Sequence, residues 1–210
     1  MLLSERQIGK AFSSPPSACN RMKSLICAIL LCAVPASAGE IPAVNIPPSL
    51  WQRNWLSQED EGSCVHASAV MLWRWQGQYA WADYWKKKYR GGEYESRLHA
   101  RCDKEGVTYC DTYDENDISH LTWAVATRRG AVVCVTNGPL YGYRGEICHA
   151  VCLVHLDEKW AGILDCNDTG QGPGGIKWVG REAFLRDWLR SGSWAWSPVS
   201  TPPAPPQLTK

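Results

Sequence analysis

The stretch Gln58-Glu-Asp-Glu-Gly-Ser-Cys64-Val-His-Ala-Ser-Ala-Val-Met-Leu-Trp-Arg-Trp75 changes at its cysteine from a polar turn to an apolar helix. Ser63 is a suitable N-cap, because its hydroxyl can accept a hydrogen bond from an unpaired N–H group of the first turn. Cys64 would then lie in that first turn, where the helix dipole stabilises a thiolate. Nearly every residue from Ala67 to Trp73 is apolar, which predicts a helix buried on most sides and ended by Gly77. Such a cysteine is typical of a nucleophile, and it requires a base from elsewhere in the chain.

The N-terminal part of the chain has the pattern of a secretory signal peptide. Basic residues in the segment Arg21-Met-Lys23 precede an apolar run from Leu25 to Val34, and Pro35-Ala-Ser-Ala38 supplies an A-x-A cleavage site. The apolar run is too short to span a membrane. We therefore predict a signal peptide over residues 1–38, with Met22 as an alternative start, and a secreted or periplasmic protein without a membrane segment after cleavage.

Composition indicates one globular domain after the signal peptide. The chain is 45% hydrophobic and 20% charged, which is too apolar for a disordered protein, and residues 39–210 are enough for one core. Without the four basic residues and the one acidic residue of segment 1–38, the formal charge changes from +1 to −2. No basic stripe is present, so we expect no nucleic-acid partner, and we expect a monomer.

The cysteines indicate one free thiol and several disulfides. Three of the ten cysteines lie in the signal peptide, and an odd number remaining in an exported protein suggests that one is unpaired. With Cys64 set aside, six could form three disulfides; Cys102 and Cys110 are the expected local pair, and the connectivity of the other four stays open. Two cysteine–histidine groups have irregular spacing for zinc, so no metal and no other cofactor is expected. These groups are His99 with Cys102 and Cys110, and His149 with Cys148 and Cys152.

After the Cys64 helix, the patterns change from helical to strand-like. Helical spacing of apolar residues and charged ends predict helices over 80–89, 95–104 and 114–129. Alternating apolar residues then predict strands over 131–136, 147–156, 160–167, 176–179 and 193–199, with one further helix over 181–190. Helices followed by antiparallel strands predict the α+β class. We expect an extended lead-in over 39–50, one domain over 51–199, and a Pro-rich disordered tail over 200–210.

The candidate base is His149, which shares a face of its predicted strand with Val151 and Leu153. The next predicted strand carries Asp165 and Asn167 on one common face. A three-residue turn places Asn167 opposite His149, whereas a shorter effective spacing brings Asp165 closer, and either could hold the imidazole in the required tautomer. A Cys-His-Asn or Cys-His-Asp group activates a thiol, because the imidazolium lowers the thiol pKa and later returns the proton to the leaving group.

Three motifs carry a resemblance to a known family. Gln58 is followed by five residues and then by the Cys64 nucleophile, His149-Ala150-Val151 follows a strand, and Asn167-Asp-Thr-Gly170 comes later. In these features the chain resembles the papain-like cysteine peptidase superfamily over roughly residues 51–199. The resemblance implies a papain-like fold, with a buried nucleophile helix in a helical N-terminal part packed on an antiparallel β-sheet. It also implies that Gln58 donates a side-chain N–H to the oxyanion hole, together with the backbone N–H of Cys64.

A second likeness concerns the bacterial leader-peptide peptidases of bacteriocin export. In those enzymes an Asp takes the third role before a final helix with Phe and Trp, and here Asp165 and Phe184-Leu-Arg-Asp-Trp188 fit that pattern. Together the resemblances imply an exported thiol hydrolase that cleaves a peptide or isopeptide bond through an acyl-enzyme. The expected substrate is a peptide or protein, with peptidoglycan peptides as one candidate. The alternatives are a transamidase acting on cell-wall peptides and a catalytically silent, disulfide-bonded binding module on the same fold.

Overall fold

The computed structural model describes residues 50–55, 62–92, 95–167 and 175–199. All of them belong to the compact unit Ala38–Lys210. The predicted signal peptide, residues 39–49 of the lead-in, Gln58, most of the loop that follows Asn167 and the predicted tail lie outside the described residues. Among the described helices, none combines the length and the apolar character needed to cross a membrane.

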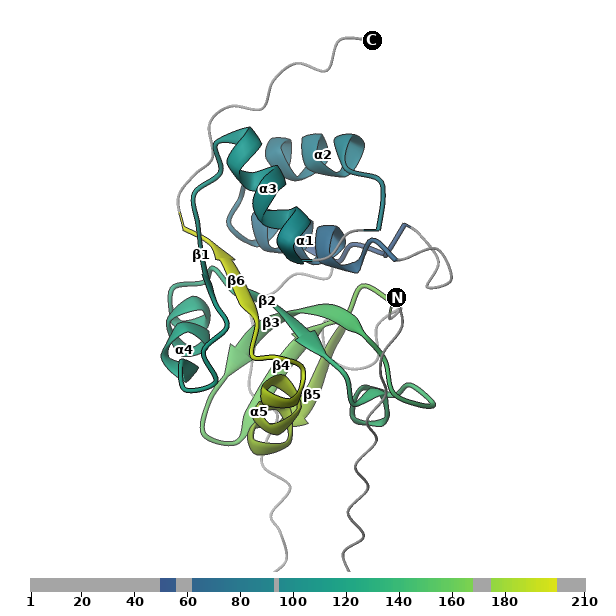
Figure 1. Cartoon of the computed structure of the whole chain (residues 1–210), viewed down its shortest axis with the longest axis vertical. Helices are drawn as coiled ribbons and strands as arrows, with labels where there is room; N and C mark the ends of the chain where they lie inside the picture. Colours follow the sequence, from purple (N-terminus) through teal and green to yellow (C-terminus); the bar gives the residue numbers. More distant parts are fainter. Residues whose placement is uncertain (1–49, 56–61, 93–94, 168–174, 200–210) are drawn as a thin grey trace, which may run out of the picture. The chain divides into compact units, whose positions relative to one another are not determined.

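Helices dominate the first part of the domain and strands the second, which confirms the predicted α+β class (Figure 1). The early helices match the predicted ones closely, because apolar residues at helical spacing define their buried faces. Gly77 has a positive φ of 77° directly after the first helix, as expected for a C′ residue. In chain order the elements are α1 (Cys64–Trp75), α2 (Tyr79–Lys88), α3 (Glu95–Glu105), β1 (Tyr109–Thr112), α4 (Ile118–Ala126), β2 (Ala131–Val135), the 3₁₀-helix η3 (Gly138–Tyr141), β3 (His149–Leu156), β4 (Trp160–Leu164), β5 (Ile176–Gly180), α5 (Arg181–Arg190) and β6 (Ala195–Pro198).

The strands form one antiparallel sheet in the order β1-β6-β2-β3-β4-β5. Strand β3 lies inside this sheet, so both of its edges are hydrogen-bonded to neighbours. On one side His149 lies opposite Val135 of β2, and on the other side Cys152 lies opposite Leu164 of β4. This pairing fixes the start of β3, where His149 is located.

The two faces of the sheet belong to two hydrophobic cores. On one face Val132, Ala150 and Cys152 pack with α1, α2 and α3; on the other face Val133 and Val151 pack with α4 and α5. Figure 1 shows α1, α2 and α3 grouped together, with α4 and α5 next to the strands. Helix α1 is buried from Val65 to Trp73, which confirms the prediction of a buried helix packed on an antiparallel sheet.

Most of the fully buried aromatic volume consists of tryptophan. Trp73 of α1 contacts Trp85 at a ring-centroid distance of 4.7 Å and Trp196 of β6 at 5.8 Å. Both partners are fully buried, and each buried aromatic side chain contributes several kcal/mol at about 25 cal/mol per Å² of buried apolar surface. These rings therefore anchor α1 to α2 and to the sheet.

One predicted helix and one predicted strand have wrong bounds; the helix predicted over 114–129 ends at Ala126. The helix predicted over 114–129 begins at Ile118, because the Asp117 side chain accepts a hydrogen bond from the backbone N–H of His120 as an N-cap. The strand predicted over 160–167 ends at Leu164, where pairing with β3 and β5 stops. The second difference decides which residue reaches His149.

The predicted disulfides do not match the structure, because all seven cysteines of the described residues are free thiols. Cys102 is fully buried in the core, whereas Cys110 is exposed on β1, so the expected local pair occupies two different environments. Cys152 is also buried, and its thiol donates a hydrogen bond to the Ser68 carbonyl at 3.0 Å. These buried cysteines serve as small core side chains.

Candidate active site

Helix α1 begins at Cys64, which places a half-buried thiol in the first helical turn. Ser63 occupies the N-cap position, but its hydroxyl makes no capping hydrogen bond, contrary to the sequence prediction. Instead, the hydroxyl donates to Asn54 Oδ1 at 2.5 Å and accepts from the backbone N–H of Trp55 at 3.0 Å. The N–H groups of the first turn therefore receive no cap from Ser63, and such groups favour an anion.

His149 and Asp165 form a buried pair beside Cys64. His149 Nε2 lies 2.8 Å from Asp165 Oδ1, and the side chains are 3% and 0% exposed. With Nε2 occupied by the carboxylate, Nδ1 is the imidazole nitrogen left to exchange a proton with Cys64. The pair thus has the geometry that orients a general base.

The electrostatics of the site favour a thiolate next to an imidazolium. Burial raises the pKa of the Cys64 thiol, but its hydrogen bond with His149 and the positive charge of His149 outweigh burial and lower it. Burial lowers the pKa of His149, but hydrogen bonds with Asp165, Cys166 and Cys64 hold that pKa well above its usual value. Burial also raises the pKa of Asp165, yet the hydrogen bond and charge of His149 keep it far below its usual range. Both directions favour transfer of the thiol proton to the imidazole, next to an ionised carboxylate.

Two side chains that the sequence analysis did not select hold the other oxygen of the carboxylate. The Tyr143 hydroxyl donates to Asp165 Oδ2 at 2.7 Å, and Lys177 Nζ lies 3.2 Å from the same oxygen. The backbone N–H of Asn167 donates to Oδ1 at 2.9 Å. Asp165 is consequently fixed from three directions besides His149.

Asn167, the other candidate for the third position, has a different role. Its Oδ1 accepts a hydrogen bond from Asn54 Nδ2 at 3.0 Å. Continuing the pairing of Cys152 with Leu164 would place Asn167 opposite His149, but β4 ends at Leu164 and Asp165 reaches the imidazole instead. Of the two residues, the described contacts place Asp165 on His149.

Residues 51–55 connect the two halves of the site, and we call them the tie segment. The Trp51 indole donates to the Asp165 carbonyl at 2.8 Å, and the backbone N–H of Asn54 donates to the Cys166 carbonyl at 2.9 Å. Asn54 Oδ1 also accepts the hydrogen bond from Ser63, directly before Cys64. The tie segment therefore sets the start of α1 relative to the residues around Asp165.

A second link joins α1 directly to β3. Ser68, one helical turn after Cys64, donates its hydroxyl hydrogen bond to the carbonyl of Ala150 at 3.2 Å. Ala150 follows His149 on β3, so the link holds the helix in register with the strand that carries the base. Secondary structure thus positions both Cys64 and His149.

Three ligand atoms that could bind a metal lie together in the site. They belong to His149, Asp165 and Cys166, within 4.8 Å of one another, and they form the one such group among the described residues. The carboxylate already faces the Lys177 ammonium and accepts from Tyr143, and a second cation at this position would meet that positive charge. The group therefore fits a proton-transfer site better than a metal centre.

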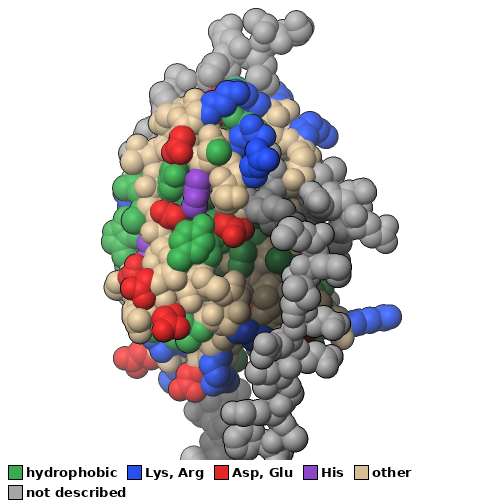
Figure 2. Space-filling view, viewed as in Figure 1, with side chains coloured by type: hydrophobic (Ala, Val, Ile, Leu, Met, Phe, Trp, Pro, Cys, Tyr) green, Lys and Arg blue, Asp and Glu red, His purple; other side chains and the backbone are tan. Residues whose placement is uncertain are grey.

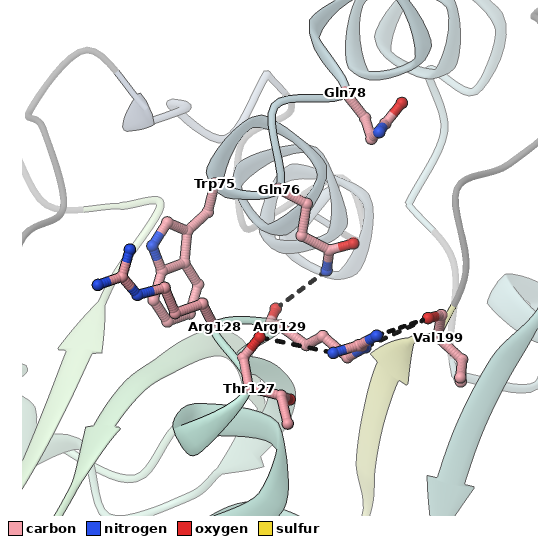
Figure 3. A pocket seen from close by; sticks show the side chains of 7 residues that line it. All are labelled: Trp75, Gln76, Gln78, Thr127, Arg128, Arg129 and Val199. Atoms are coloured by element: carbon pink, nitrogen blue, oxygen red, sulfur yellow. Dashed lines mark hydrogen bonds between the residues drawn. The ribbon is translucent and has the colours of Figure 1, made fainter.

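A separate cavity of about 300 Å³ lies between the end of α1 and the end of α4 (Figure 3). Arg129 crosses it, donating from its guanidinium to the Val199 carbonyl, and the Gln76 amide donates to the Arg129 carbonyl. Its lining has no thiol, imidazole or carboxylate, so it offers neither nucleophile nor base. The lining residues are Trp75, Gln76, Gln78, Thr127, Arg128, Arg129 and Val199.

Figure 2 shows the charged side chains on one face of the molecule. The face shown in Figure 2 carries both acidic and basic side chains among uncharged ones. The candidate active site is distinguished by the buried pair of His149 and Asp165.

The predicted site residues differ in where the structure places them. Cys64, His149 and Asp165 come together, Asn167 lies beside them without contacting the imidazole, and Gln58 lies outside the described residues. Tyr143 and Lys177 were missed. The alternation of β5 carries a signal for Lys177, because Ile176 faces the α1 core and its neighbour must point to the other face.

Comparison with known proteins gives one structural likeness. No family model matches the chain, and no curated relative was found. Among solved structures, the chain is similar to the crystal structure of a proposed C39-like peptidase from Bacillus anthracis, with a TM-score of 0.41 and 21% sequence identity. The match covers 53% of this chain and 62% of that chain, which is less than two thirds of the other protein. What the site can do therefore follows from its own residues and distances.

Proposed function

We propose that the protein is a thiol hydrolase that cleaves an amide bond through an acyl-enzyme. The observation that carries the proposal is the connected series of Cys64, His149 and Asp165, in which His149 Nε2 lies 2.8 Å from the carboxylate and the imidazole is hydrogen-bonded to the Cys64 thiol. Cys64 is free rather than disulfide-bonded, as a nucleophile must be. These two conditions favour an enzyme over a silent binding module.

The proposed reaction begins when the Cys64 thiolate attacks the carbonyl carbon of the substrate amide. The carbonyl oxygen becomes an oxyanion near the first turn of α1, where the backbone N–H of Cys64 can donate to it, with Gln58 as the expected second donor. His149 then gives its proton to the leaving amine, and the C–N bond breaks to leave a thioester. Water, deprotonated by His149, hydrolyses the thioester and restores the thiolate.

The substrate and the location of the enzyme belong to the same proposal. The family resemblance supports a peptide or isopeptide substrate, with peptidoglycan peptides as one candidate. The signal-peptide pattern of residues 1–38 supports an exported protein that has lost that segment. An amine in place of water would resolve the thioester by transamidation, so the same site supports either outcome. Both reactions require the free thiol of Cys64, whether water or an amine resolves the thioester.

Alkylation of the purified protein with iodoacetamide tests the proposal. We expect Cys64 to react far faster at pH 6 than the exposed thiols Cys110 and Cys148, because an ordinary thiol is almost fully protonated at that pH. His149→Ala should remove this selectivity, since the imidazolium that stabilises the thiolate is lost. If Cys64 reacts no faster than Cys110, or equally fast without His149, Cys64 is not an activated nucleophile and the proposal fails.

A further inference from the structure

Lys177 places a positive charge on the far side of the carboxylate that holds His149. Its Nζ lies 3.2 Å from Asp165 Oδ2, while His149 Nε2 lies 2.8 Å from Asp165 Oδ1. The Lys177 side chain is 17% exposed, and the carboxylate is not exposed at all. The two cations therefore share one buried anion, one on each oxygen.

Lys177 is held in this place by its surroundings. Its ammonium donates a hydrogen bond to the Tyr141 carbonyl at the end of η3, and it lies over the Tyr143 ring at 5.0 Å from the ring centroid. Gly142, between these tyrosines, has a φ of 87°, a conformation that favours glycine and that lets both neighbours face the ammonium. These contacts hold the Lys177 ammonium in one position beside Asp165.

The charges around the imidazole come from every element that packs against it. Cys64 lies at the start of α1, Tyr143 in the segment between η3 and β3, Asp165 and Cys166 after β4, and Lys177 on β5. Burial raises the pKa of Cys166 and the pKa of Tyr143, so both stay neutral at ordinary pH. In the reactive state the thiolate and the carboxylate are balanced by the imidazolium and the ammonium, and the buried group is electrically neutral.

This neutrality has a consequence for catalysis. A buried carboxylate with no other cation would bind the imidazolium tightly, and a histidine that holds its proton too firmly is a poor acid for a leaving amine. The Lys177 charge opposes the positive charge on His149 and weakens that binding. The carboxylate can then orient the imidazole without trapping its proton.

We propose that Lys177 is a positioning residue that acts through Asp165 to weaken the hold of His149 on its proton, so that His149 can protonate the leaving amine. This inference rests on the proposed thiol hydrolase function. It assigns to β5 a role in tuning the base, in addition to its role as a strand of the sheet.

The test is an NMR titration of the His149 imidazole in the full chain carrying ¹³C-labelled histidine, with the signal assigned by its loss in His149→Ala. Lys177→Met removes the charge at similar length, and Lys177→Arg retains it. At an effective dielectric near 20, removing a unit charge at this range should raise the titration midpoint of His149 by about one to two pH units. Lys177→Arg should titrate close to the wild type.

Lys159→Met is the matched control, because Lys159 is exposed in the turn between β3 and β4 and its loss should leave the midpoint unchanged. An unchanged midpoint in Lys177→Met, or an equal rise in Lys177→Arg, would overturn the inference. Iodoacetamide selectivity for Cys64 in the wild type reports the proposed function separately, so a failure of one is not mistaken for a failure of the other. The Arg variant also shows whether a shift in the Met variant reflects lost charge or lost folding.

Discussion

The choice between Asp165 and Asn167 as the residue that orients His149 can be tested by paired substitutions. Asp165→Asn keeps the shape of the side chain but removes its charge. Oδ1 of the carboxylate accepts from His149 and from the Asn167 backbone, and Oδ2 accepts from Tyr143 and Lys177. An amide has one oxygen and one NH₂ group, so it cannot accept on both sides.

Each orientation of the new amide has a cost. With the amide oxygen toward His149, the NH₂ group faces the Lys177 ammonium. An ammonium group can donate hydrogen bonds but cannot accept one, so the NH₂ group gains no bond from it. With the NH₂ group toward His149, Nε2 must lose its proton, and Nδ1 then carries the proton that it should accept from Cys64. Both orientations weaken the imidazolium.

The size of the effect follows from the lost charge-assisted hydrogen bond, which contributes about 1.5–3 kcal/mol. At 1.36 kcal/mol per pKa unit, the imidazolium becomes easier to deprotonate by about one to two pKa units. The thiolate that depends on it becomes rarer, so alkylation of Cys64 at pH 6 should fall by about ten- to a hundredfold. Turnover of an amide substrate should fall further, by up to about 10⁴-fold, the loss seen when the Asp of a Ser-His-Asp triad becomes Asn.

The assay is the second-order rate constant for iodoacetamide, with thermal unfolding measured on the same samples to verify that the variants are folded. Asn167→Ala is the comparison, because it leaves the contact between His149 and Asp165 and the backbone N–H at position 167 in place. Its rate should stay within about threefold of the wild type, which corresponds to less than 1 kcal/mol. A large loss in Asn167→Ala together with a wild-type rate in Asp165→Asn would refute the assignment of Asp165.

Two further predictions concern stability. Gly130→Ala should lower the free energy of unfolding by about 1–3 kcal/mol in urea denaturation, because the φ of Gly130 is 65° and a Cβ there would lie 2.7 Å from Leu72 Cδ2. Gly91→Ala is the control. A Cβ at Gly91 meets nothing within 4 Å, so this change should alter the free energy of unfolding by less than about 0.5 kcal/mol. Glu105 has a lowered pKa, because burial, which raises it, is outweighed by hydrogen bonds from Lys88 and two tyrosines. The stability that Glu105 contributes is therefore complete above its pKa in the unfolded chain, about 4.3. This contribution is lost as the pH falls through the lower pKa that Glu105 has in the folded protein. Glu105→Gln should be less stable than the wild type at pH 7, and a difference that stayed constant down to pH 2 would contradict this account.

The local elements of the fold could be predicted well from the sequence. Apolar spacing and glycine at helix ends are local signals, so α1, α2, α3 and α5 lie within a residue or two of their predicted bounds. The start of α4 was missed because Asp117 competes successfully as an N-cap with the earlier acidic residues. Boundaries depend on single hydrogen bonds of this kind, whereas the existence of an element depends on many residues.

The site could be predicted only in part. The helix start predicted the position of Cys64 and the strand pattern that of His149, because both signals are local, and the structure brings the two side chains together. The choice of Asp165 depends on where β4 ends, because the strand pairing continued past Leu164 would place Asn167 opposite His149. The contacts of Tyr143 and Lys177 depend on the conformation of η3 and on its approach to β5, for which the sequence has no repeating pattern. The prediction for Gln58 stays a prediction.

The tie segment has a practical consequence for where this domain can be cut. A fragment that began at Cys64 would contain the thiol, the imidazole and the carboxylate, and would look complete by its secondary structure. It would nevertheless lack Trp51, which donates to the Asp165 carbonyl, and Asn54, which donates to the Cys166 carbonyl. Asn54 also accepts the hydrogen bond from Ser63, directly before the helix. Truncation on the C-terminal side of residue 55 should therefore leave the sheet but disturb the candidate site, so the part of the chain that this site needs begins before its first helix.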